Sequence, residues 1–171
     1  TAGTLAAVEI PDPTAARTPG PSGGLYSTAA DTARFYQAIL NGGELDGARI
    51  LSRKSVELMT SNHVGERFQP GSGFGLGVSV LRDLGARGDL GTVGEFGWGG
   101  AYHSSYWVDP QEQLVVVQLT QTIPAGDVDD FGRLRALVPA TTAVTIVRDG
   151  MPAPGAIGRR VTSGVEVRYA G

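Results

Sequence analysis

The chain has 171 residues, 41% of them apolar, and a formal net charge of −3, enough length and apolar content for one globular domain. Its 14 cationic residues are scattered rather than clustered, which argues against a nucleic-acid partner. No apolar run is long enough to predict a membrane span. The absence of cysteine excludes disulfides, thiolate metal sites and cysteine nucleophiles, and it leaves the cellular compartment open.

The first half of the chain predicts an arm followed by helices. Residues 1–24 are rich in proline and glycine, which predicts an extended arm. A helix then begins after Ser27 or Thr28 and ends at Asn41-Gly42-Gly43, with one apolar face formed by Ala29, Ala33, Tyr36 and Leu40. A short turn over 44–49 leads to a second helix over 53–59, capped by Ser52.

The second half predicts strands. Apolar residues alternate with small ones from Phe74 to Val80, a pattern typical of a half-buried strand. Segments 97–108 and 114–121 predict an antiparallel hairpin that turns at Asp109-Pro110, and Leu114-Val115-Val116-Val117 should be buried on both faces. A closing helix is expected from about Asp129 to Pro139.

We therefore expect a partial domain over 25–140 and a tail of uncertain structure over 141–171. Two β-like pieces, 144–148 and 161–169, lie in that tail.

The segment Gly97-Trp98-Gly99-Gly100-Ala101 carries the strongest functional signal. Glycines inside a strand are costly, and they are tolerated where a ligand or another backbone must come close. A substrate lying against such a strand could receive a backbone N–H at a developing oxyanion. A bulge or tight crossing within the sheet is the alternative, and the glycines alone leave both open.

Three blocks in a fixed order carry a resemblance to a known family. They are Gly23-Gly24-Leu25-Tyr26-Ser27-Thr28-Ala29-Ala30-Asp31, then Phe74-Gly75-Leu76-Gly77, then Trp98-Gly99-Gly100 followed by Val108-Asp109-Pro110 and Leu114-Val115-Val116-Val117. The arrangement resembles the C-terminal region of class C β-lactamases, penicillin-binding proteins and related carboxylesterases, over roughly 20–138. The resemblance implies an α+β fold, an antiparallel sheet with helices packed on it, of the β-lactamase/transpeptidase type.

The resemblance also implies roles for particular residues. Trp98-Gly99-Gly100 stands where this family has Lys-Thr-Gly, and the N–H of Ala101 would form half of an oxyanion hole. Trp98, Gly99, Gly100 and Tyr102 would contact the substrate. Because indole lacks the charge of lysine, a small neutral acyl ester is favoured over a β-lactam, as in the esterase branch of the family.

The family's nucleophile is missing from the chain. A Ser-x-x-Lys motif is impossible because Lys54 is the sole lysine and Leu51 precedes it by three residues. We therefore expect a hydrolase part that is inactive alone and is completed by an N-terminal half of the same protein. The alternative is a non-catalytic binding or structural domain, and the exposed faces of a half fold also make a homodimer conceivable.

Other candidate groups are weaker. Gly20-Pro21-Ser22-Gly23-Gly24 has the Gly-x-Ser-x-Gly pattern of the nucleophile turn of α/β-hydrolases, but no predicted strand precedes it. His103, predicted on a strand and facing away from Trp98, is expected to be a structural or surface histidine rather than a general base, and His63 to be solvated. Neither histidine suggests a metal site, and Asp127, Asp129 and Asp130 fit a helix start better than a cation site. No cofactor is expected.

Four aromatic residues form a band that fits a ligand or, more commonly, a core: Tyr102, Tyr106, Trp107 and Trp98.

Overall fold

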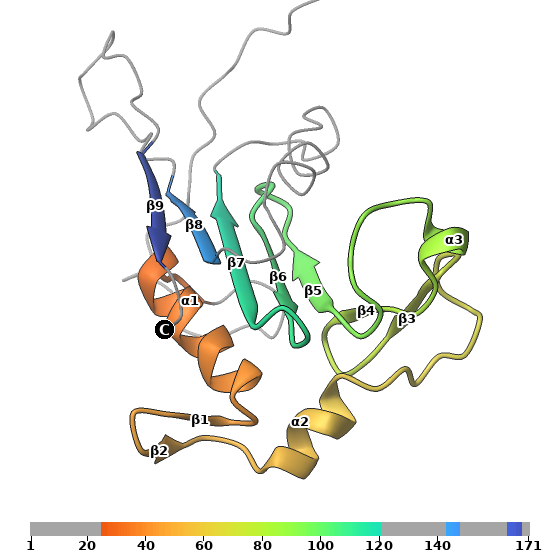
Figure 1. The fold of residues 1–171 in the computed structure, drawn as a ribbon, viewed down its shortest axis with the longest axis horizontal. Helices are drawn as coiled ribbons and strands as arrows, with labels where there is room; N and C mark the ends of the chain where they lie inside the picture. The colour runs from red at the N-terminus through yellow and green to blue at the C-terminus, as the bar shows by residue number, and fades with distance from the viewer. Residues whose placement is uncertain (1–24, 121–142, 148–163, 169–171) are drawn as a thin grey trace, which may run out of the picture.

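The computed structural model describes residues 25–120, 143–147 and 164–168, the last two segments as backbone strands. They form one seven-stranded sheet in the order β3-β4-β5-β6-β7-β8-β9, with helices beside it (Figure 1). The strands are β3 Ser72–Phe74, β4 Ser79–Leu81, β5 Phe96–Gly99, β6 Ser105–Asp109, β7 Leu114–Leu119, β8 Ala143–Val147 and β9 Gly164–Arg168. Neighbouring strands are antiparallel except β7 and β8, which are parallel. The predicted α+β fold is confirmed, with one parallel pair that was not predicted.

Helix α1, Ala29–Leu40, packs on the sheet against β6, β7 and β8. Its N-cap is Thr28, whose side chain accepts the N–H of Asp31, and Asn41 caps its end. The predicted bounds of this helix are therefore confirmed. The expected turn that follows is a small hairpin of β1, Glu44–Leu45, and β2, Ala48–Arg49, as Figure 1 shows.

Helix α2, Arg53–Met59, begins at Ser52, whose side chain accepts the N–H of Ser55. Its bounds and its cap match the sequence prediction because both depend on residues within one turn of the helix. A third, four-residue helix, α3, Leu84–Arg87, lies in the connection between β4 and β5 and is capped by Asp83.

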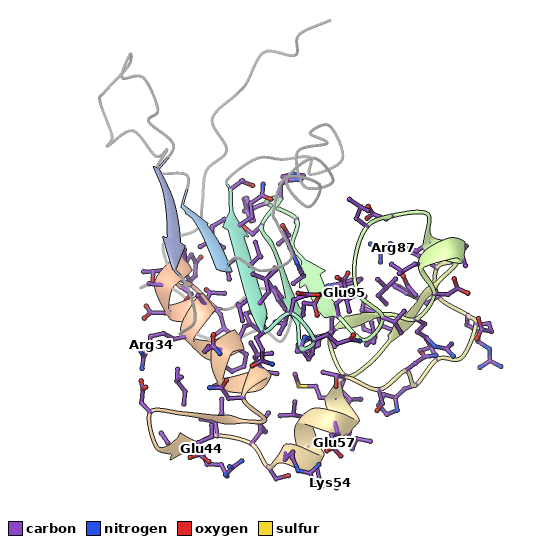
Figure 2. The ribbon with its side chains drawn as sticks, in the orientation of Figure 1. Arg34, Glu44, Lys54, Glu57, Arg87 and Glu95 are labelled. Carbon is purple, nitrogen blue, oxygen red and sulfur yellow. The ribbon has the colours of Figure 1, made fainter. Side chains whose placement is uncertain are left out.

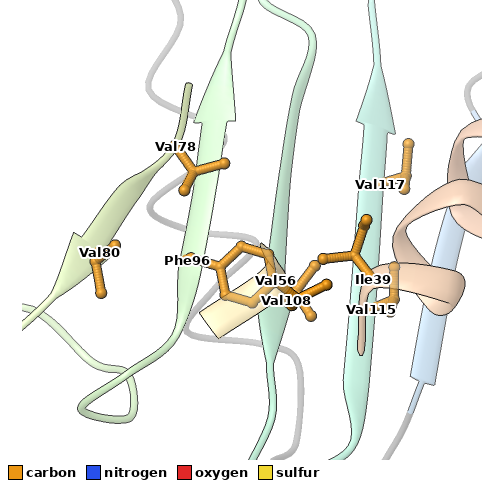
Figure 3. Packing of buried hydrophobic residues seen from close by; sticks show 8 residues of the cluster. All are labelled: Ile39, Val56, Val78, Val80, Phe96, Val108, Val115 and Val117. Atoms are coloured by element: carbon orange, nitrogen blue, oxygen red, sulfur yellow. The ribbon is translucent and has the colours of Figure 1, made fainter. Parts of the chain in front are cut away.

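One hydrophobic cluster joins both helices to the sheet (Figure 3). Ile39 of α1 and Val56 of α2 meet side chains from one face of β4 to β7, and the buried members from the sheet region are Val78, Val80, Phe96, Val108, Val115 and Val117. Residues Leu114 to Val117 are all buried, so the prediction that this strand is covered on both faces is confirmed.

Two predicted strands are wrong, each for the same reason. The segment 74–80 is not one strand but the turn region of the β3–β4 hairpin, where the Gly75 N–H donates to the Val78 carbonyl (2.8 Å) and Gly77 has a φ of 86°. Segment 97–108 likewise divides into β5 and β6, because the Gly100 N–H donates to the Ser104 carbonyl (2.8 Å). Alternating small and apolar residues fit a strand and a tight hairpin equally well, and glycine permits the hairpin.

The predicted β-like pieces of the tail are confirmed as β8 and β9. The expected arm over 1–24, the serine motif at 20–24, the closing helix and the aspartates at 127, 129 and 130 lie outside the described residues. In the described part of the chain, no helix has the length and apolarity required to cross a bilayer.

The core makes a stability prediction. Val108 has a relative exposure of 0%, so Val108→Ala removes two buried methyl groups and should lower the free energy of unfolding by about 2 kcal/mol in urea denaturation. Val93→Ala is the matched control, since Val93 is exposed and truncating it should change stability by less than ~0.5 kcal/mol. Equal effects at the two positions would contradict the described core.

Candidate active site: a free edge beside a cleft

Among the strands that the structure describes, the end of β5 is bonded to a neighbour on one side only. Strand β4 pairs with β5 at Val80↔Phe96 and Ser79↔Gly97 and goes no further, because the chain turns away over 75–78. Strand β6 continues to pair with β5 as far as Gly99↔Ser105. Trp98 and Gly99 therefore lie at a free edge inside the sheet.

The direction of the backbone groups at this edge follows from two hydrogen bonds. The Glu95 carbonyl accepts the Leu81 N–H (2.9 Å), so odd-numbered residues of β5 face β4. The Gly100 N–H donates to Ser104 (2.8 Å), so even-numbered residues face β6. Because successive residues of an extended chain alternate, Gly99 faces the free edge, and Ala101 follows it two residues later in the β5–β6 turn. Among the described residues the Ala101 N–H donates no hydrogen bond, and Ala101 is exposed.

A cleft of about 460 Å³ runs along this part of the sheet. Its walls combine the glycine-rich end of β5, the turn after it and parts of β6, with residues from the loop before β3 and from α3. The lining residues are Phe68, Gln69, Ser79, Leu81, Arg87, Glu95, Phe96, Gly97, Trp98, Gly99, Gly100, Ala101, His103, Ser104, Ser105, Tyr106 and Trp107. A volume of this size suits a small organic ligand.

Two charged residues approach the cleft from different elements, Arg87 from α3 and Glu95 from just before β5 (Figure 2). Each also supports the scaffold. Arg87 Nη1 donates to Ser72 Oγ (3.0 Å) and so joins α3 to β3. Glu95 is buried, and its carboxylate accepts the Thr92 N–H (3.2 Å) in the turn that leads into β5.

The glycines of this segment divide into two kinds. A Cβ on Gly97 would lie 2.2 Å from the Tyr106 carbonyl oxygen and 2.9 Å from Trp107 Cα, so a close backbone crossing requires glycine there. A Cβ on Gly99 would approach nothing closer than the Ser104 carbonyl oxygen at 3.3 Å, and one on Gly100 nothing closer than 4.0 Å. The tight-crossing interpretation therefore explains Gly97 and applies weakly to Gly99, while contacts among the described residues leave Gly100 unexplained.

Trp98 is held in place yet remains accessible. Its ring meets Phe74 edge-on, with centroids 4.8 Å apart, and tilts toward Phe68 at 6.1 Å. It is nevertheless 45% exposed, so it is not an ordinary core residue. An indole fixed by neighbouring rings offers a preformed apolar wall to a ligand.

The other aromatic residues do not form one band. Trp107 is buried, and as the next residue of β6 its side chain is on the opposite face of the sheet from that of Tyr106. The Tyr106 ring stacks on Tyr36 of α1, with ring centroids 3.6 Å apart. Burial raises the pKa of both tyrosines, so Tyr106 stays neutral at physiological pH and offers the cleft no phenolate base. Tyr102 does not line the cleft; its carbonyl accepts the Thr120 hydroxyl (2.8 Å).

The prediction for His103 rested on a strand that does not exist. His103 lies in the turn between β5 and β6 and lines the same cleft as Trp98. His63 is exposed in its loop, as predicted, and its Nε2 lies 2.8 Å from the Leu58 carbonyl oxygen.

Lys54 lies far from the cleft, on α2, where it pairs with Glu57 (2.7 Å; Figure 2). It therefore cannot act as a base at the cleft. In the part of the chain that the structure describes, no three His, Cys, Asp or Glu side chains gather to hold a metal ion.

Sequence reasoning missed several cleft residues. Phe68 and Gln69 come from the polar loop 63–73, whose glycines and proline predict a surface segment of the kind that sometimes borders a site, but nothing in the sequence singled out these two residues. Arg87 and Glu95 had no local signal, because only the folded chain brings α3 beside β5.

The comparisons with known proteins agree with this architecture. The family model described as Beta-lactamase matches residues 1–139, and the chain belongs to that family. Fold and family together define a β-lactamase-like serine hydrolase scaffold.

Two curated proteins and one solved structure are similar to this chain over part of their length. Two proteins of Mycobacterium tuberculosis, Protein Rv1367c of strain ATCC 25618 / H37Rv and Uncharacterized protein MT1414 of strain CDC 1551 / Oshkosh, are each 38% identical over 120 residues, which is 63% of this chain and 30% of the relative. The solved structure of EstCE1, a hydrolase with promiscuous acyltransferase activity, matches with a TM-score of 0.53 and 29% identity, over 66% of this chain and 29% of that one. The chain thus spans about 30% of the length of these curated relatives.

The close crossing at Gly97 predicts that Gly97→Ala lowers the free energy of unfolding by roughly 1–3 kcal/mol, because backbone atoms must move to admit the methyl group. Thermal or urea unfolding measures this change. Gly85→Ala in α3 is the control, since its Cβ would have only an ordinary contact, 3.4 Å from Asp83, and alanine favours a helix. If Gly97→Ala is as stable as the wild type, the crossing is described wrongly.

Proposed function

We propose that this chain supplies the oxyanion-binding and substrate-binding strand of a serine acyl hydrolase that acts on small neutral esters. The nucleophile, on this proposal, comes from polypeptide outside this chain, the N-terminal half of the same protein. The observation that carries the proposal is the free edge at the end of β5, where the Ala101 N–H has no partner among the described residues and lies beside a cleft.

The chemistry of ester hydrolysis explains why such an edge would be useful. When a serine oxygen attacks the ester carbonyl, the carbonyl oxygen becomes an anion that is stabilised by fixed N–H donors. The Ala101 N–H would be one donor, and the N–H of the attacking serine the other. Collapse of the tetrahedral anion then expels the alcohol and leaves an acyl-enzyme, which water hydrolyses.

The open space at Gly99 and Gly100 supports the same proposal. A flat acyl group must lie against the strand for its carbonyl oxygen to reach Ala101. Both glycines line the cleft, and no contact among the described residues demands glycine at Gly100.

Trp98 favours neutral substrates. An indole packed on Phe74 offers an apolar face and one N–H, and it cannot form the ion pair that a lysine would form with a substrate carboxylate. EstCE1, a hydrolase with promiscuous acyltransferase activity, accords with acyl chemistry on this scaffold.

The proposal predicts activity only in a completed protein. The chain alone should not turn over 4-nitrophenyl acetate. Co-expression with an N-terminal segment that carries the family's Ser-x-x-Lys should give turnover, followed as nitrophenolate release, and an acyl adduct on the serine of that segment, detected by mass spectrometry. A chain that binds the ester yet never supports acylation in the pair would instead be the non-catalytic binding domain.

Within the completed protein, Gly99→Ala should lower turnover on the order of tenfold to a hundredfold, because the methyl group displaces the acyl group from the strand. The stability of Gly99→Ala should stay within ~1 kcal/mol of wild type, since its Cβ would need the Ser104 carbonyl oxygen, 3.3 Å away, to move by only a small amount. Unchanged turnover in this variant would show that Gly99 of β5 does not contact the bound acyl group.

A further inference from the structure

His103 has a backbone conformation that favours other residues. Its φ of 62° lies in the left-handed region, which costs a residue with a side chain roughly 1 kcal/mol relative to glycine. The conformation belongs to the β5–β6 turn, in which the His103 N–H donates to the Gly100 carbonyl (3.0 Å). Glycine or asparagine would satisfy this turn at lower cost.

Three non-glycine residues of the described chain have a positive φ, and His103 alone among them lines the cleft. Asp46, in the β1–β2 hairpin, pairs with Arg34. Gln113, in the β6–β7 turn, donates from its side chain to the Pro110 carbonyl (2.7 Å). Asp46 and Gln113 therefore lie in turns away from the cleft, whereas His103 lies in the turn that borders it.

The turn that carries His103 is anchored to the end of β7. Thr120 Oγ1 donates to the Tyr102 carbonyl (2.8 Å), and Ser104 Oγ donates to the Thr120 carbonyl (3.2 Å). These bonds hold the residues on either side of His103, so the imidazole is presented from a fixed backbone, two residues beyond Ala101.

We propose that His103 is a ligand-binding residue of the cleft: its imidazole hydrogen-bonds an oxygen of the ester, or of the tetrahedral anion formed from it, that binds at Ala101. This inference rests on the proposed function, because it names a second contact for the same bound group. An imidazole ring N–H is a suitable donor to such an oxygen. The side chain would account for a histidine at a position where the turn prefers glycine.

The test uses the chain itself and a stable anion, phenyl methylphosphonate, which mimics the tetrahedral intermediate. Both tryptophans of the chain line the cleft, so intrinsic fluorescence reports binding. His103→Gly should weaken binding about tenfold, as expected for the loss of one hydrogen bond to a charged group. Its unfolding midpoint should be unchanged or higher, because glycine suits the turn.

Gln113→Gly is the matched control. It relieves the same backbone conformation in a turn away from the cleft, so its affinity for the phosphonate should equal that of the wild type. His103→Asn, which also tolerates the left-handed region, provides a second variant should His103→Gly fail to fold, and it should bind as weakly because its shorter side chain does not reach the ligand.

A direct measurement needs no variant. The chain has two histidines, and the ring resonances of His103 should shift in NMR spectra as the phosphonate is added, while those of His63 stay in place. Wild-type affinity in His103→Gly, with His103 resonances unmoved, would overturn this inference and leave the proposed function standing. No binding by the wild-type chain would overturn both this inference and the oxyanion role of Ala101.

Discussion

The early end of the pairing between β4 and β5 is the constraint on which the site depends. The bond between Gly75 and Val78 closes a turn immediately before β4. The pairing of β4 with β5 therefore stops at Ser79↔Gly97, and among the described strands β5 continues with one side open. An open edge normally invites aggregation. Here the opening is only a few residues long and is bordered by Trp98 and the turn at 100–104, so it forms a bounded notch rather than a full edge strand.

The segment 97–100 meets two demands with the same residue type. At Gly97 the sheet needs close approach to β6, and this keeps β5 fixed against its neighbour. At Gly99 and Gly100 the absent side chains leave the notch open. Close packing against β6 at Gly97 and access to the cleft at Gly100 therefore come from glycines three residues apart in the chain.

The parts of this protein that sequence predicted well are those decided locally. Both main helices begin and end at their expected caps, since Thr28, Ser52 and Asn41 act within one turn. The fully buried strand β7 follows from four consecutive apolar residues. Hairpins rich in glycine were mistaken for single strands, because the period of two in Phe74 to Val80 does not reveal where the chain reverses. That error concealed the notch, and it also placed His103 on the wrong face.

The segment that lines the cleft could be singled out from sequence, but the arrangement of the cleft could not be predicted. The resemblance indicated Trp98 to Ala101, and these four residues do line one cleft. The direction of their backbone groups depends on a strand two elements earlier, and the partners of Trp98 depend on Phe68 and Phe74. Long-range contacts of this kind leave no periodic trace in the chain.

The donor of the proposed function is a backbone N–H, that of Ala101, rather than a side chain. The identity of the Ala101 side chain has no bearing on its N–H; only the local conformation does. That conformation is set by the crossing at Gly97, by the bond from Gly100 to Ser104 and by the bond from Thr120 to Tyr102. The residues that would decide how well an oxyanion is held are thus mostly ones that never contact it. Side-chain motifs alone therefore describe the proposed site incompletely, and the course of the backbone through the β5–β6 turn has to be considered with them.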